Sequence, residues 1–116
     1  MPAQRLAALL VGLALALPAL ADPPPEQVIR IEARKYEFIP PVIELKRGVP
    51  VVLEFVSLDR KHGARQKELG IDLEIAPGHP ARVRLAPEKE GTFEFHCSIF
   101  CGSGHEEMSG RIVVKP

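Results

Sequence analysis

A segment near the C-terminus of the chain gathers side chains that bind soft metal ions. Cys97, Cys101, His105 and Met108 lie within 12 residues, whereas the whole chain of 116 residues has two cysteines and two methionines. Thiolate, imidazole and thioether ligands together favour copper over hard cations, which prefer oxygen ligands. Zinc accepts thiolates and imidazoles but gains little from a thioether. The segment therefore predicts a copper site.

The spacing of the two cysteines leaves one alternative, a structural disulfide. A bond between Cys97 and Cys101 would close a very small loop and would restrict little of the entropy of the unfolded chain. It would also leave the histidine and the methionine of the segment unexplained. Gly102 and Gly104, in contrast, allow the sharp turn that a loop closing around a metal needs. The residues favour a metal site over a disulfide and leave both open.

Alternation of apolar and polar residues predicts that β-strands position this segment. Period-two patterns, with turns between them, occur at residues 29–33, 43–45, 51–55, 83–85, 93–97 and 112–114. About six or seven short strands at such intervals are typical of an antiparallel β-sandwich. We therefore expect an all-β chain with a single Greek-key β-sandwich domain at residues 27–116.

Two polar segments that contain glycine interrupt the alternation, and we expect both to be loops. They cover residues 57–70 and 98–109, and each follows an apolar strand. Loops held by a rigid sheet are common places for binding sites. Cys97 shares one strand face with Phe93 and Phe95, so its side chain is expected to point into the sandwich.

The first 21 residues have the features of a secretory signal peptide. Arg5 provides a positive charge, an apolar run follows, and Ala19-Leu20-Ala21 offers the small residues needed for cleavage after Ala21. The run is short for a membrane span and contains a proline. Residues 22–26 then form a Pro-rich leader. We expect an exported, periplasmic protein without a transmembrane segment in its mature chain; an uncleaved N-terminal anchor is the alternative.

Charge and composition exclude several other classes of function. The chain has 15 basic and 15 acidic residues, so its net charge does not indicate nucleic-acid binding. Glu106 and Glu107 are adjacent, which places them poorly as an acid and base pair, and the sequence shows no nucleophile constellation. We expect a binding protein, not an enzyme, and a monomer.

The metal segment resembles a known copper-binding motif. Its pattern, Cys-x3-Cys-Gly-x2-His-x2-Met, is similar to the binuclear copper (CuA) signature of cytochrome c oxidase subunit II and nitrous oxide reductase. From about residue 27 to 115, the segment at 38–41, the turn at Gly48 and the pair Pro77-Gly78 resemble the cupredoxin framework more weakly. The resemblance implies a cupredoxin-like sandwich with two copper ions bridged by two thiolates, Cys97 and Cys101.

The resemblance also implies the remaining ligands, position by position. His105 and the backbone carbonyl of Ile99 would complete one copper ion. Met108 and a histidine from an earlier loop would complete the other. That histidine is His62, because the segment from Asp59 to His62 resembles the Asp-x2-His segment of the family.

The two other histidines are expected to have no role as ligands. His79 lies in a Pro-Gly-His-Pro turn and is expected to be solvated. His96 is the neighbour of Cys97, but strand alternation places it on the opposite face.

The sequence departs from the oxidase pattern at several points. By the resemblance, oxidase subunits have a glutamate at the position of Ile99, and its side chain helps to hold magnesium. The side chain of Ile99 cannot do this, so only the backbone carbonyl of Ile99 can bind metal. The chain has no tryptophan, and no apolar segment long enough to span a membrane follows the first 21 residues. These departures indicate a free-standing copper protein and not an oxidase subunit.

Three functions remain open for such a protein. The favoured one is electron transfer with a redox partner such as a c-type cytochrome. The second is copper handling, in which a periplasmic carrier, tolerance protein or metallochaperone delivers copper to an acceptor protein. In the third, His62, Cys101, His105 and Met108 bind one ion in a mononuclear blue-copper site. Cupredoxins associated with iron uptake are a weaker resemblance at the level of the framework.

Overall fold

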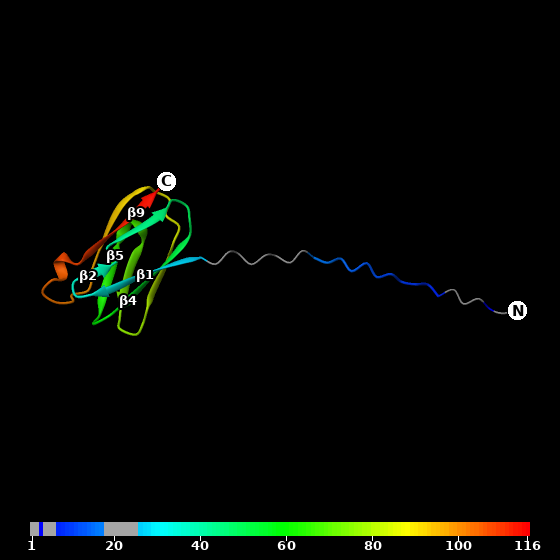
Figure 1. Ribbon diagram of the computed structural model, residues 1–116, viewed down its shortest axis with the longest axis horizontal. Coiled ribbons are helices and arrows are strands. Elements are labelled where there is room, and N and C mark those ends of the chain that lie inside the picture. Colours follow the sequence, from blue (N-terminus) through cyan, green and yellow to red (C-terminus); the bar gives the residue numbers. More distant parts are fainter. Residues whose placement is uncertain (1–2, 4–6, 18–25) are drawn as a thin grey trace.

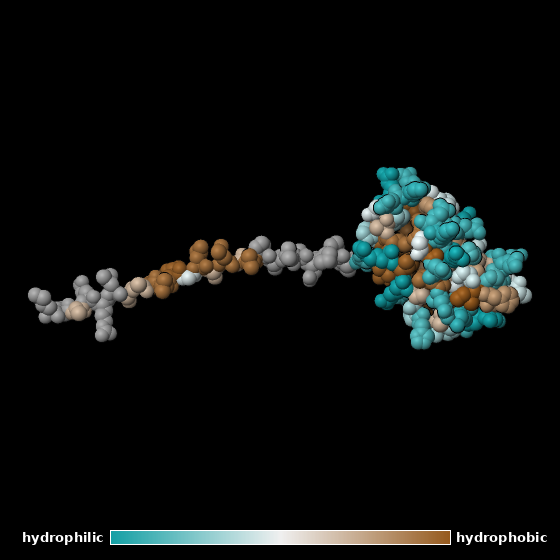
Figure 2. Space-filling model, turned by 180° about the vertical axis from the view of Figure 1, so that it is seen from behind, coloured by the Kyte–Doolittle hydropathy of each residue, from teal (hydrophilic) through white to brown (hydrophobic). Residues whose placement is uncertain are grey.

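A computed structural model describes residues 3, 7–17 and 26–116 of the chain. The predicted cleavage after Ala21 and all of the Pro-rich leader except Glu26 lie outside the described residues. Residues 7–17 have no helix or strand, and their large apolar side chains are between 78% and 96% exposed. Figure 2 shows these side chains outside the domain, whose visible face is mostly hydrophilic. No helix in the described ranges is long and apolar enough to cross a membrane.

The domain is a sandwich of two β-sheets (Figure 1). One sheet has the strand order β2-β1-β4-β7, and the other has the order β3-β9-β8-β5-β6. Within the described residues the strands are β1 (Gln27–Arg34), β2 (Glu37–Ile39), β3 (Val42–Lys46), β4 (Val51–Ser57), β5 (His62–Gln66), β6 (Ile71–Ile75), β7 (Ala81–Leu85), β8 (Gly91–His96) and β9 (Ser109–Lys115). Most neighbours within a sheet are not consecutive in sequence, and the all-β sandwich class is confirmed.

The inward residues of the alternating strands form one apolar core between the sheets. In β4, Val51, Leu53 and Phe55 are buried, and the residues between them are half-buried. Phe38, Phe55 and Phe95 meet at the centre, with ring centroids 4.8 to 6.3 Å apart in edge-to-face arrangements. Such pairs add stabilisation beyond the burial of their area. This core holds the ends of β5 and β8 at a fixed separation.

The expectation that the sandwich is purely antiparallel is wrong. β1 runs parallel to β4, and β3 runs parallel to β9. The parallel pairs arise because the chain leaves one sheet and returns to the side of an earlier strand. Alternation reports which face of a strand is buried, but it carries no information on the direction of the neighbouring strand.

The expectation of a continuous loop at residues 57–70 is also wrong. Residues 62–66 form β5, and a 3-10 helix, η1 (Lys67–Leu69), follows. Four of the five residues of β5 are buried, but they include His62, Gly63 and Gln66, which are not apolar. A buried strand built from small and polar residues therefore escapes a search for hydrophobic alternation.

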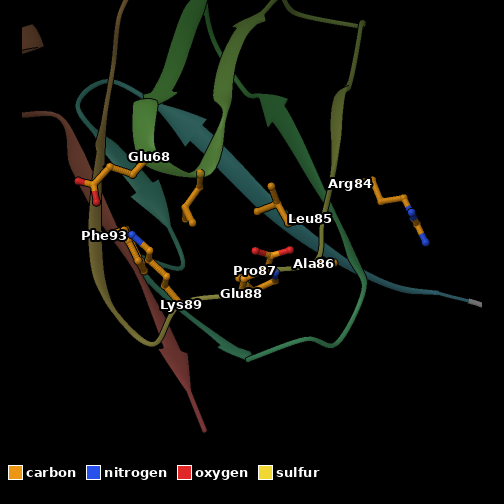
Figure 3. Close-up of a pocket in the computed structure, with 9 residues that line it drawn as sticks. Glu68, Arg84, Leu85, Ala86, Pro87, Glu88, Lys89 and Phe93 are labelled. Atoms are coloured by element: carbon orange, nitrogen blue, oxygen red, sulfur yellow. The ribbon is translucent and has the colours of Figure 1, made fainter.

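A cavity of about 540 Å³ lies at the end of the sandwich where β7 ends and β8 begins (Figure 3). Leu69, Leu85 and Phe93 contribute apolar walls, and Arg84 and Lys89 are among its charged residues. None of the predicted metal ligands lines this cavity. The segment between β8 and β9 lies at the other end of the domain.

The aromatic cluster predicts a large cost for truncating Phe95, whose side chain is fully buried between Phe38 and Phe55. We expect Phe95→Ala to lower the free energy of unfolding by about 3–5 kcal/mol, because it removes apolar contacts and leaves a cavity. Urea unfolding of the metal-free protein measures this loss. Val49→Ala, at a position that is 47% exposed, is the control and should change stability by less than about 0.5 kcal/mol. Equal losses for the two variants would contradict the described core.

Candidate metal centre

The metal segment is a loop whose two ends are fixed by the sheet. It leaves β8 at His96 and returns to β9 at Ser109, directly beside it in the same sheet. The backbone N–H of Cys97 donates to the carbonyl of Met108 over 3.0 Å, which closes the loop. Near its end the loop contains a 3-10 helix, η2 (His105–Glu107). This closure brings the first and last predicted ligands of the loop together.

The two cysteine sulfurs form the centre of the site. The Sγ atoms of Cys97 and Cys101 are 3.5 Å apart, and both side chains are buried. They are free thiols, because a disulfide bond would place the sulfurs about 2.0 Å apart. As predicted from alternation, Cys97 is part of the buried core. Two buried thiols at this separation can bind the same metal ion or ions.

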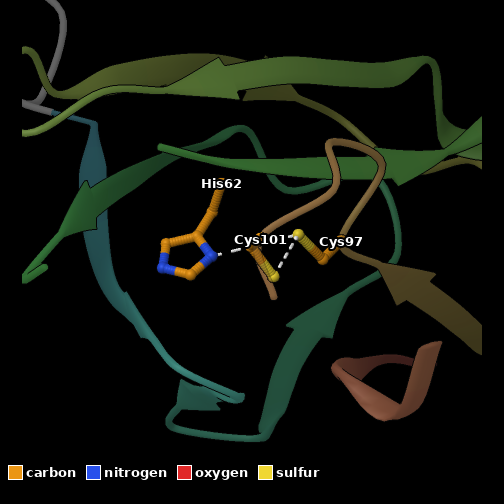
Figure 4. A group of neighbouring side chains, drawn as sticks. All are labelled: His62, Cys97 and Cys101. Carbon is orange, nitrogen blue, oxygen red and sulfur yellow. Dashed lines mark hydrogen bonds between the residues drawn. The ribbon is translucent and has the colours of Figure 1, made fainter. Parts of the chain in front are cut away.

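His62 approaches the sulfurs from β5, the neighbour of β8 in the same sheet. Its ring is fully buried, and its Nδ1 atom lies 3.9 Å from the Sγ atom of Cys97. The possible ligand atoms of His62, Cys97 and Cys101 all lie within 4.8 Å of one another (Figure 4). The approach is close because of Gly63, where a Cβ atom would overlap Ser98 of the loop. A residue from β5 and the loop after β8 thereby share one site.

The other predicted ligand atoms lie around the same sulfur pair. The Nδ1 atom of His105 is 3.6 Å from the Sγ atom of Cys101, and the Sδ atom of Met108 is 3.8 Å from it. The carbonyl oxygen of Ile99 lies 3.1 Å from the Sγ atom of Cys97. Each of these three groups is therefore within 4 Å of a cysteine sulfur.

The two histidines that were expected to have no role as ligands lie elsewhere. His79 and His96 are both exposed. His79 is in the turn between β6 and β7, and His96 ends β8 opposite Ser109 of β9. Within the described residues, neither belongs to the group formed by His62, Cys97 and Cys101.

Asp59 contacts the ring of His62, and the sequence showed it only as part of a motif. Its carboxylate lies 2.6 Å from the Nε2 atom of His62 and accepts backbone N–H groups of Lys35 and Arg60 over 2.7 and 2.6 Å. Partial burial raises the pKa of Asp59, but these hydrogen bonds outweigh it and hold the pKa below its ordinary value. An ionised Asp59 only accepts hydrogen bonds, so Nε2 of His62 carries the proton. The Nδ1 atom, which lies toward the sulfurs, is then the ring atom available to a metal.

The environment of Cys101 keeps its thiol protonated when no metal is bound. Burial, together with the hydrogen bond and the charge of Cys97, raises the pKa of Cys101 to about 11. Thiolates, not thiols, bind metals, so binding must displace protons from this site. The available donors are two sulfurs of cysteine, one thioether and two imidazoles, mostly in apolar surroundings. This donor set fits copper well and fits hard cations poorly.

Comparison with known proteins identifies a matching family and several relatives of the chain. Residues 5–114 match the family described as the cupredoxin-like domain. Cytochrome c oxidase subunit 2 of Thermus thermophilus is 32% identical over 92 residues, which are 79% of this chain and 68% of that protein. Nitrous-oxide reductase of Stutzerimonas stutzeri is 30% identical over 76 residues, which are 62% of this chain and only 12% of the reductase. The resemblance inferred from the loop motif is confirmed.

A solved structure with bound copper is also similar to the chain. It is the metal-binding domain of the Cu(I)-exporting P-type ATPase CopA of Streptococcus pneumoniae D39, solved with Cu(I). It is 26% identical, has a TM-score of 0.62, and covers 77% of this chain and 85% of that chain. The same fold is therefore found in proteins described as oxidase subunits and in a copper exporter.

The raised pKa of Cys101 predicts how the stability of the metal-free protein depends on pH. In the unfolded chain the thiol ionises near its ordinary value of 9.0, whereas in the folded chain it ionises at about 11. The folded protein holds the thiol proton of Cys101 more tightly than the unfolded chain does. The folded state therefore keeps its full stability below the lower pKa and loses stability as the pH rises toward the higher one. We expect the free energy of unfolding to fall between these values and Cys101→Ser to reduce that fall. Equal slopes for the reduced wild-type protein and the variant in urea unfolding would contradict the assignment.

The hydrogen bond from His62 predicts a role for Asp59 in metal affinity. Asp59→Ala should weaken copper binding by about 10–100-fold, because residues that orient a metal-binding histidine have effects of this size. Competition with a chelator measures the affinity. Glu74→Ala is the matched control, because Glu74 forms an exposed ion pair with Lys61 over 2.8 Å. If both variants bind copper as tightly as the wild type, Asp59 does not orient the histidine.

Proposed function

The chain belongs to the family of cupredoxin-like domains, and on this basis we propose that it is an exported electron-transfer protein with a binuclear copper centre. The observation that carries the proposal is the pair of buried sulfurs 3.5 Å apart, with two imidazoles and a thioether around them. A disulfide loop would need neither the imidazoles nor the thioether.

In this proposal the residues divide the coordination of two ions between them. Cys97 and Cys101 would hold both ions through their thiolates. His105 and the carbonyl of Ile99 would help to hold one ion. Met108 and His62 would help to hold the other. The side chain at position 99 is free to be apolar, because only its backbone oxygen is needed.

Copper in such a site supplies a reversible one-electron couple. The residues of this chain hold that site with little freedom to rearrange, because four of the ligand side chains are fully or almost fully buried and the loop is closed by a backbone hydrogen bond. Asp59 fixes the ring of His62, and the apolar core excludes water from the sulfurs. A site that keeps one geometry in both oxidation states is suited to electron transfer, not to substrate turnover.

One edge of the site is open to a redox partner. His62 is fully buried, whereas His105 is half-buried, and its ring lies 5.5 Å from the ring of Phe100. Phe100 itself is 72% exposed. An apolar contact next to a ligand supports electron exchange at this edge with a partner such as a c-type cytochrome.

Copper handling is the second candidate function. Its support is the likeness to the metal-binding domain of a Cu(I)-exporting ATPase. In this case the same soft ligands would hold Cu(I) and release it to an acceptor protein. A mononuclear site formed without Cys97 and a cupredoxin associated with iron uptake are the remaining variants of copper binding.

Export and association state are part of the proposal. The large apolar side chains at residues 7–17 are highly exposed, as expected for a signal peptide that is removed. We propose cleavage after Ala21 and a periplasmic monomer that consists of a Pro-rich leader at 22–26 and a cupredoxin-like domain at 27–116.

The proposed ligand set predicts the copper content of the protein. Wild-type protein should bind two copper ions per chain, and its partly oxidised form should give an EPR signal from one electron shared by two copper nuclei. Cys97→Ser should bind at most one ion, because it loses one bridge. His62→Ala should lose affinity, and His79→Ala is the matched histidine control. One copper ion per wild-type chain would contradict the binuclear centre.

A second measurement separates electron transfer from copper handling. The copper-loaded protein should exchange electrons with a c-type cytochrome and should keep its copper in the presence of an apo acceptor protein. Rapid transfer of Cu(I) to the acceptor without electron exchange would instead favour the second function.

A further inference from the structure

A two-residue turn that contributes no predicted ligand touches both parts of the metal centre. Lys35 and Tyr36 connect β1 to β2 in the other sheet of the sandwich. On one side, the backbone N–H of Lys35 donates to Asp59, which in turn binds the ring of His62. On the other side, the ring of Tyr36 packs on the metal loop. The turn therefore contacts the two segments that must converge on the sulfurs.

The contact between Tyr36 and the loop is close and involves successive residues. A Cβ atom at Gly104 would overlap the ring of Tyr36, and a Cβ atom at Gly102 would overlap its hydroxyl oxygen. Between these two glycines, the hydroxyl of Ser103 lies 3.4 Å from the hydroxyl of Tyr36. The ring is half-buried and packs against the apolar core. It thus covers the backbone that connects Cys101 to His105.

At position 104, the ring of Tyr36 and not the backbone conformation requires a glycine. Its φ angle is −95°, which any residue can adopt. Gly102, in contrast, has a φ angle of +133°, which is unfavourable for other residues whatever their surroundings. A side chain is excluded at position 104 only because the ring of Tyr36 occupies its space.

We propose that Tyr36 is a positioning residue for the metal loop. Its ring presses on the bend at residues 102–104 and thereby holds Cys101 and His105 beside Cys97 before any metal arrives. This inference deepens the proposed function, because it assigns the preorganisation of the copper ligands to a residue outside the ligand set. At Gly104 the role depends on the ring and not on the hydroxyl, because the three nearest atoms to the position of a Cβ atom there all belong to the ring.

A double-mutant cycle tests this role. Gly104→Ala should displace the loop, which exposes Cys101 to alkylation in the reduced, metal-free protein and weakens copper binding by about 10–100-fold. Tyr36→Ala should have similar effects, whereas Tyr36→Phe should behave as the wild type. In the Tyr36→Ala background, Gly104→Ala should add little, because the atoms with which it collides are gone.

Two measurements distinguish the role of Tyr36 from the proposed copper centre and from a general loss of stability. Alkylation rates of Cys101 are measured without metal, so they decide the role of Tyr36 even if the protein proves not to bind two copper ions. Thermal unfolding is measured for each variant, and the comparison is made where the protein is folded. If Gly104→Ala in the wild-type background leaves the alkylation rate and copper affinity unchanged, or if its effects add fully to those of Tyr36→Ala, the proposal is overturned.

Discussion

The site depends on keeping two sulfur atoms buried and 3.5 Å apart without a bond between them. Thiols lose hydration when they are buried, and bringing them together as thiolates would add repulsion, which is why the pKa of Cys101 lies near 11. The fold therefore disfavours a thiolate at Cys101 when no metal is bound, although it places both sulfurs where a metal can bind them. Metal ions would relieve this constraint, because they replace the protons and neutralise the charge.

The sandwich keeps the sulfurs in place because different strands and turns hold the different parts of the site. β8 and β9 hold the two ends of the Cys97–Met108 loop, and β5 brings His62 to the sulfurs past Gly63. Asp59 sets the protonation of the His62 ring. The turn between β1 and β2 belongs to the opposite sheet, yet it contacts both Asp59 and the loop. The aromatic core packs between the two sheets that carry these strands and this turn, so the geometry of the site depends on the whole domain.

Features of the site that are local in sequence could be predicted from the sequence. The loop ligands lie within 12 residues, and the strand before them alternates clearly, so both the donor set and the burial of Cys97 were accessible. The parallel pairing of β1 with β4 was not, because alternation carries no strand direction. β5 was missed because its buried residues are small or polar. The contacts of Tyr36 with a loop 66 to 68 residues further along leave no periodic signal at all.

The central claim is that both cysteines bind the same copper ions. X-ray absorption at the copper edge of the fully loaded protein tests it most directly, because it reports the atoms around copper. We expect two sulfur neighbours from cysteine for each copper ion, nitrogen neighbours from imidazole, and a second copper ion close to the first. A spectrum with one cysteine sulfur for each copper ion and no neighbouring copper would contradict it.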